Sequence, residues 1–271
     1  MKKQFEILRL ACIIILVSPF VLVWIPFFQD LLTNAITVGF PKYPKYADSF
    51  IASFQQLSIT LVTTVLFAAT ITMVFGYLSI LSTAVGKITA SVLEAIESIP
   101  AILIALFFYA PVSGFLASSS HGSSSLVSLV VFILAATITC LPESVRGIAL
   151  PLGELYHRKY SLSFRSYGFT RSRILVILMN STTMRDALRR TSTAILLKTL
   201  VLDTSFGFII QLGFGSEGTP AHASPGALIA ANDKAIFPGG DPLLFWLPVI
   251  LLVMISMAFL LVLGNDKEET V

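Results

Sequence analysis

Residues 57–81, LSITLVTTVLFAATITMVFGYLSIL, form the apolar stretch that decides the fold class of this chain. The stretch lies within a longer segment, residues 49–86, that contains no charged residue. An α-helix of roughly 20 apolar residues crosses the hydrocarbon core of a bilayer, which is about 30 Å thick. The Thr, Ser, Ala and Gly residues of the stretch suit a helix that packs closely against other helices in a membrane. The stretch therefore predicts a membrane-spanning helix.

The composition extends this prediction to the whole chain. Of its 271 residues 55% are hydrophobic and 12% are charged, with a mean hydropathy of +0.87. Such a chain has too little polar surface to coat a water-soluble globule. The apolar runs are continuous rather than short and alternating, which excludes a membrane β-barrel. We therefore expect an all-α polytopic membrane protein.

Six spans are predicted from the apolar runs between charged residues. Their approximate ranges are 10–28, 57–81, 88–110, 126–141, 193–212 and 243–264. The first is predicted as a membrane helix rather than a signal peptide, because no small-residue cleavage site follows it. The segments 29–48 and 213–242 are predicted as external loops, and Pro100 predicts a kink or break in the third span.

The distribution of basic residues orients these spans. Six spans place both termini on one side, together with the large basic segment 142–190. By this topology fourteen of the 18 Lys and Arg residues lie on the side of the termini, three lie opposite and one lies within a span. The positive-inside rule then predicts cytoplasmic termini and a cytoplasmic basic loop.

The sequence contains no recognisable catalytic or cofactor motif. It has no Walker-type phosphate loop, so ATP-driven transport would need a separate motor subunit. Its three histidines, scattered over loops, have no metal-ligand spacing, and a nucleic-acid partner is not expected. Glu94 and Glu97 are interpreted as acids near a helix N-terminus that the helix dipole stabilises. We therefore expect neither an enzyme nor a metal site.

The basic loop has its own predicted structure. Residues 154–180 read ELYHRKYSLSFRSYGFTRSRILVILMN, two amphipathic stretches separated by Gly168. Gly168 can adopt the positive φ that closes the first helix, so helix, glycine break, helix is the predicted order. A short cytoplasmic helix with aromatic and basic side chains suits a groove on a soluble partner. The alternative is a basic loop that only fixes topology and contacts lipid headgroups.

A family resemblance is carried by this loop and by three further segments. Its residues Tyr160, Arg165, Gly168, Arg173 and Ile174 resemble the cytoplasmic "EAA" loop of bacterial ABC importer permeases, in the form found in the dipeptide, oligopeptide and nickel group. The segments that agree in order and position are 97–106 (ESIPAILIAL), 212–215 (LGFG) with 224–230 (SPGALIA), and 261–265 (LVLGN). The similarity is closest to the C-type permease of the pair that such systems use.

The sequence also departs from the family pattern. The usual Glu-Ala-Ala of the loop is Leu162-Ser163-Phe164, and the usual histidine is replaced by Leu178. The tryptophan of the Ser-Trp-Gly segment is replaced by Pro225. The resemblance therefore supports the architecture more than the substrate, since loops vary while the helical framework is kept.

The resemblance implies a subunit of a larger assembly. The expected fold is that of a type I ABC importer permease, one transmembrane domain with a cytoplasmic coupling helix. The implied partners are a second permease subunit, two cytoplasmic ATPases that bind ATP and Mg²⁺, and an extracytoplasmic substrate-binding protein; this chain itself binds no cofactor. The implied location is the bacterial inner membrane, and the implied substrates are peptides or nickel and other metal chelates. The residues expected to couple to the ATPase are Tyr160, Ser163, Phe164, Arg165, Gly168, Arg171 and Arg173.

Two charged residues lie well within a predicted span. Lys198 and Asp203 are functional candidates, because charge inside a membrane is costly. Lys198 either has a role of its own or reaches towards the cytoplasmic headgroups. Asp203 either lines the translocation pathway or pairs with the partner permease, and Pro100 is a second pathway candidate. A six-span secondary transporter or channel, independent of ATP, is the alternative function, although no paired broken helices indicate inverted repeats.

Overall fold

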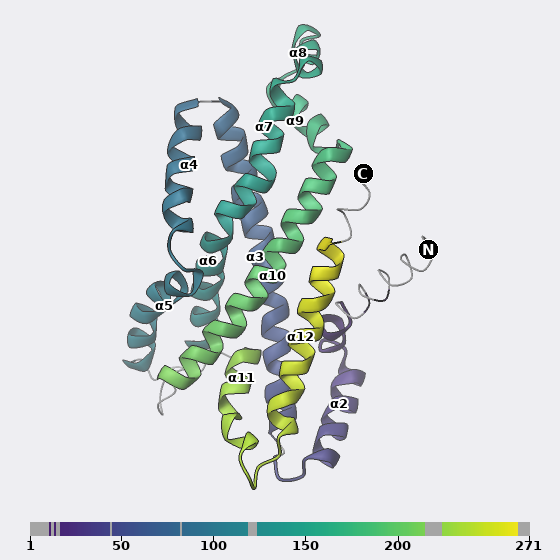
Figure 1. Ribbon diagram of the computed structural model, residues 1–271, viewed down its shortest axis with the longest axis vertical. Helices are drawn as coiled ribbons and strands as arrows, with labels where there is room; N and C mark the ends of the chain where they lie inside the picture. Colours follow the sequence, from purple (N-terminus) through teal and green to yellow (C-terminus); the bar gives the residue numbers. More distant parts are fainter. Residues whose placement is uncertain are drawn as a thin grey trace.

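The computed structural model describes residues 11, 14, 17–43, 45–81, 83–118, 124–214 and 224–264. All of the regular structure in these ranges is helical, and Figure 1 shows long helices packed side by side. The α-helices are α2 (Pro26–Gly39), α3 (Tyr46–Leu81), α4 (Thr83–Glu97), α5 (Ala101–Ser118), α6 (Ser124–Ser144), α7 (Leu150–His157), α8 (Lys159–Ser166), α9 (Arg171–Met179), α10 (Thr182–Phe214), α11 (Pro225–Ala231) and α12 (Leu243–Gly264). A π-helical turn, η1 (Val145–Ala149), joins α6 to α7, and a 3₁₀ turn, η2 (Asp233–Ile236), follows α11.

Four of the described helical segments are long and apolar enough to cross a membrane. They are Tyr46–Leu78, Leu126–His157, Thr182–Ile210 and Leu243–Leu260. A fifth candidate is the pair Ser91–Glu97 and Ala101–Pro111, which is bent by 89°. This is the architecture of a multi-span membrane protein, in agreement with the coarse sequence prediction.

The predicted break at Pro100 is confirmed. Helix α4 ends at Glu97, and α5 begins at Ala101 after a sharp turn. Proline lacks the N–H group that would continue the helix, and it disfavours helical backbone in the preceding residue, Ile99. The third predicted span is therefore two helices that meet at an angle.

The prediction for residues 10–48 is partly wrong. Residues 10, 12, 13, 15 and 16 of the predicted first span lie outside the described residues. The helix that includes residues 17–22 gives way to a turn at Val23 and Trp24, so it does not continue to Phe28. Pro26 then starts α2, because proline is favoured at the first position of a helix. The segment predicted as an irregular external loop is thus largely an amphipathic helix, which buries Ile36.

Several helices are longer than the apolar runs that predicted them. Helix α3 has 36 residues and is about 54 Å long at 1.5 Å per residue, compared with about 30 Å of hydrocarbon. Helix α10 begins at Thr182, within the predicted loop, and α6 continues through η1 and α7 to His157. Hydropathy marks where a helix leaves lipid and not where its hydrogen bonding ends. The basic loop is therefore built largely from helical extensions beyond the membrane.

Helices α3, α6 and α10 pack together through small side chains at the centre of the molecule. Thr60, Thr64, Ala68 and Thr72 recur every fourth residue of α3, and none has an exposed side chain. Ala68 packs in one cluster with Cys140 of α6 and Ile195 of α10. Small residues in such a stripe let membrane helices approach closely.

The second predicted external loop is also partly helical. Its described part contains α11, which is buried against α10. Ser224 caps α11 by accepting a hydrogen bond from the Ala227 amide at 3.2 Å. A Cβ on Gly226 would overlap the carbonyl oxygen of Thr204 in α10, so only glycine permits this approach. Burial of α11 at the end of α10 was not evident from the Gly- and Pro-rich composition.

Candidate functional site: the protruding loop and the polar cleft

Helices α7, α8 and α9 form a protrusion at one end of the molecule. Figure 1 shows α8 at the tip, beyond the ends of α4 and α10. The base of the protrusion is an apolar cluster contributed by η1, α7, α9 and the start of α10. Its buried members are Ile148, Leu152, Leu155, Tyr156, Ile174, Leu175, Leu178 and Met184, and Phe164 and Phe169 pack against them. The tip is thus fixed to the transmembrane helices by a core of its own.

Gly168 closes α8 in a Schellman motif. Its φ is +80°, a conformation that side chains with a Cβ rarely adopt. The Phe169 amide donates to the Phe164 carbonyl at 3.1 Å, and the Gly168 amide donates to the Arg165 carbonyl at 3.0 Å. The rings of Phe164 and Phe169 pack edge to face, with centroids 5.7 Å apart. The predicted helix, glycine break and helix are confirmed.

Arg165 packs within the protrusion. Its guanidinium lies 4.1 Å from the centre of the Tyr156 ring, and it donates to the Tyr156 carbonyl oxygen at 3.4 Å. Stacking on an aromatic face together with hydrogen bonding is a geometry that arginine favours over lysine. Arg173 stacks in the same way on Phe169, at 5.0 Å. Both arginines hold the tip of the loop in place.

The exposed apolar side chains of the tip differ from those that the sequence singled out. Leu162 is 52% exposed and Tyr167 is 77% exposed, whereas Phe164 is half-buried. Ser163 and Arg171 are exposed, and the side chain of Tyr160 lies outside the described side chains. Leu162 lies about 160° around α8 from Phe164, at 100° per residue, but the burial of Ser161 that places the inner face of α8 could not be read from the sequence.

The two pathway candidates lie in separate parts of the fold. Asp203 is fully buried on α10, one turn from Thr199 and two turns from Ile195, which are also buried. Since Ile195 packs against α3 and α6, this places Asp203 on the α10 face directed at those helices. Pro100 lies at the break between α4 and α5.

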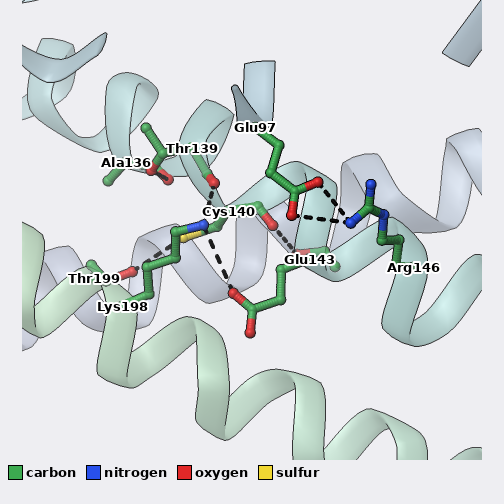
Figure 2. A network of polar contacts seen from close by, with 9 residues as sticks. Glu97, Ala136, Thr139, Cys140, Glu143, Arg146, Lys198 and Thr199 are labelled. Atoms are coloured by element: carbon green, nitrogen blue, oxygen red, sulfur yellow. Dashed lines mark hydrogen bonds and ion pairs between the residues drawn. The ribbon is translucent and has the colours of Figure 1, made fainter. Parts of the chain in front are cut away.

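A group of charged side chains lies where α4, α6, η1 and α10 meet, as Figure 2 shows. Glu97 forms an ion pair with Arg146 at 2.7 Å, with both side chains about half exposed. Lys198 donates to the Thr139 carbonyl oxygen at 2.8 Å and lies 3.8 Å from the Glu143 carboxylate. Lys198 of α10 is thus attached to α6, and the ion pair attaches α4 to η1.

The interpretation of Glu97 as an acid near a helix N-terminus is wrong. Glu97 is the last residue of α4, where the helix dipole disfavours a carboxylate. Arg146 supplies the compensating charge from 49 positions further along the chain. No local pattern in the sequence marks this pair.

The charged residues line an open cleft of about 620 Å³. Its walls are Glu97, Pro142, Glu143, Arg146, Gly147, Arg190, Thr191, Ala194 and Lys198. Gly147 allows η1 to approach α10, because a Cβ there would overlap the Thr191 hydroxyl. The π-helical turn η1 in one wall is a local irregularity of a kind that often occurs at functional sites.

Neither a metal cluster among the described side chains nor a match to a known protein assigns a function to the protrusion or the cleft. Among the side chains that the structure describes, no group of three or more His, Cys, Asp and Glu is placed to hold a metal ion. No protein-family model and no curated protein matches the chain. The function must therefore be inferred from the protrusion, the cleft and the motifs of the sequence.

Proposed function

We propose that the chain is a permease subunit of an ATP-driven importer in the bacterial cytoplasmic membrane. The observation that carries the proposal is the rigid, exposed helix α8, held at the tip of helices that extend beyond the membrane. Its position suits a coupling helix that a cytoplasmic ATPase moves. The family resemblance of the same loop supports this assignment.

The contacts within the protrusion join α8 firmly to the long helices. The Schellman motif at Gly168 and the stacking of Arg165 on Tyr156 fix α8 to α7 and α9. The apolar base then joins these helices to η1 and α10. A displacement of α8 by a partner would therefore move whole helices rather than deform a loop.

The helices that leave the protrusion are long and apolar enough to cross a membrane. The continuous helical path 124–157 and helix α10 are each about 50 Å long at 1.5 Å per residue. Both helices contribute walls to the polar cleft. In alternating access the membrane helices adopt two alternative packings. A partner that binds one packing better shifts the equilibrium between them. The π-helical turn η1 is the irregular point where one of them can bend.

The exposed surface of α8 suits a groove on a soluble ATPase. Leu162 and Tyr167 present apolar side chains at the tip, and aromatic anchors commonly dominate such interfaces. Arg171 adds a positive charge beside them. Arg165 acts as a positioning residue in this account, because its guanidinium is already stacked on Tyr156.

The rest of the assembly follows from the resemblance. A second permease subunit would complete the pathway, two cytoplasmic ATPases would bind ATP and Mg²⁺, and an external binding protein would deliver the substrate. Peptides or nickel and other metal chelates are the proposed substrates. The charge asymmetry of the chain supports cytoplasmic termini for a six-span topology.

Tagged chain purified from its native host tests the proposal. We expect a second permease and Walker-motif ATPases to co-purify, and the ATPases to be lost when Leu162 and Tyr167 are both replaced by alanine. Phe237→Ala is the matched control, because Phe237 is 67% exposed but lies after η2, outside the protrusion. A chain that purifies alone and transports solute without ATP would instead be a secondary transporter or channel.

A further inference from the structure

We propose that one face of α2 lines a water-filled path within the depth of the membrane and receives cationic groups of a solute there. This polar face consists of Asp30, Asn34 and Thr37, which recur at helical spacing and are all exposed. An importer, a secondary transporter and a channel all need such a path, so an ATPase partner is not required for it.

Helix α2 lies beside the apolar part of α12. Leu31 lines a groove with Phe54 of α3 and Leu251 of α12, and Figure 1 shows α2 running along the end of α12 that is remote from the protrusion. Leu251 is the ninth residue of α12, about 12 Å from its start at 1.5 Å per residue. Helix α12 is uncharged throughout and long enough to cross a bilayer. The first half of α2 therefore lies at hydrocarbon depth.

The exposed surface of α2 divides into an apolar stripe and the polar face. The apolar stripe consists of Phe27, Leu31 and Val38, which are all more than half exposed. Large apolar side chains gathered on one surface suit lipid or a protein partner rather than water. A charged residue such as Asp30 is costly against lipid, and at this depth it faces water or an opposite charge. Helix α2 thus presents one side to lipid and the other to water or to a partner.

The polar face carries an acid that the described part of the chain does not neutralise. No described side chain forms an ion pair or hydrogen bond with the Asp30 carboxylate. The nearest cationic residues along the sequence, Lys42 and Lys45, follow the opposite end of α2. Thr37 donates its hydroxyl proton to the Thr33 carbonyl oxygen at 2.6 Å, so its hydroxyl oxygen is left as an acceptor. A carboxylate with further acceptors beside it favours an ammonium group or a hydrated cation.

The length of the polar face favours a path for solute over a contact with a single residue. From Asp30 to Thr37 it extends about 10 Å along the helix axis, at 1.5 Å per residue. Pairing with one basic residue of a second subunit would need Asp30 alone and would leave Asn34 and Thr37 unexplained. We therefore assign the polar face to water and solute, and a protein that covers it is an outcome that the first experiment detects.

Cysteine labelling in right-side-out membrane vesicles of the native host tests the placement of α2. In a chain with Cys12→Ala and Cys140→Ala, each residue of the polar face and of the apolar stripe is replaced in turn by cysteine. A membrane-impermeant methanethiosulfonate that carries a trimethylammonium group is then added from outside. Cysteines of the polar face should react more than about tenfold faster than those of the apolar stripe, because a thiol against lipid forms little thiolate.

The other patterns of labelling overturn the proposal. Equal labelling of both sets would mean that α2 lies in bulk water outside the membrane. Absence of labelling on the polar face would mean that protein covers it. The two sets alternate along one helix, so their comparison does not depend on the absolute reactivity of any one variant.

The charge preference is measured with the Asn34→Cys variant, whose thiol is one helical turn from Asp30. Its reaction with the cationic reagent is compared with its reaction with an anionic sulfonate reagent of the same class. At a separation of about 6 Å in water, a carboxylate enriches a cation about threefold and depletes an anion equally. The ratio of the two rates should therefore fall by up to about tenfold when Asp30→Asn is added.

Glu154→Gln is the matched control, because it removes an exposed carboxylate from α7 in the protrusion. It should leave the ratio of rates at Asn34→Cys unchanged. A ratio that does not respond to Asp30→Asn would overturn the assignment of the polar face as a site for cationic groups.

Discussion

Replacing Gly168 with alanine isolates the conformational role of the residue that closes α8. A Cβ at this position would meet no atom within 4 Å, so steric overlap does not contribute. The remaining cost is the conformational free energy of holding a residue with a Cβ at a φ of +80°, about 1–2 kcal/mol. The lower entropy of alanine in the open loop offsets roughly 0.5–1 kcal/mol of this. A net local destabilisation of about 1 kcal/mol should open the loop about fivefold more often.

Hydrogen exchange measures this opening directly. The Phe169 amide donates to the Phe164 carbonyl in the closing motif, so its exchange should be about fivefold faster in Gly168→Ala. Gly153→Ala is the matched control, since Gly153 is within α7, has ordinary helical backbone and also has no atom within 4 Å of a Cβ. That change should stabilise α7 by about 0.5–1 kcal/mol. Equal or slower exchange at Phe169 in Gly168→Ala would refute the role assigned to the glycine.

Three further predictions concern the packing of the helices and the ion pair of the cleft. Gly226→Ala should lower the thermal unfolding temperature strongly, because its Cβ would overlap the backbone carbonyl of Thr204; normal stability would contradict the close packing of α11 on α10. Phe206→Ala should cost about 3–5 kcal/mol in denaturant unfolding, because the ring is fully buried; a cost below about 1 kcal/mol would show that the core collapses around it. A double-mutant cycle of Glu97→Gln and Arg146→Met should give a coupling of only about 0–1 kcal/mol that falls with salt, because both side chains are half exposed and solvent screens the pair. A larger, salt-independent coupling would mean that the pair is buried in the assembled protein.

The parts of the fold that the sequence predicted well depend on local signals. The charge-free stretch of α3 is long enough to identify a span without reference to any other segment. Gly168 and Pro100 each act through backbone restrictions on their own neighbours. Signals of this kind remain valid in any tertiary context, and the structure agrees with them.

The parts that the sequence missed depend on contacts between distant segments. Residues 29–39 of α2 fell in a predicted loop because the segment 29–48 is polar and shows no helical period, and residues 26–28 were assigned to the first span. The partner of Glu97 lies 49 residues away, and the stacking of Arg165 on Tyr156 requires the turn between α7 and α8. The resemblance marked Arg165 as a contact for a partner, whereas its guanidinium lies on the Tyr156 ring and the neighbouring Tyr167 is 77% exposed.

Site-specific crosslinking at the tip of the protrusion tests the central claim most directly. A photoreactive amino acid would replace Tyr167, and in a control chain Phe237, in membranes of the native host. Both side chains are more than 60% exposed, but they lie on different parts of the chain. Position 167 should crosslink to a cytoplasmic protein with Walker motifs, and position 237 should not. Crosslinks from position 167 to lipid alone, or to no ATPase, would contradict the assignment of α8 as a coupling helix.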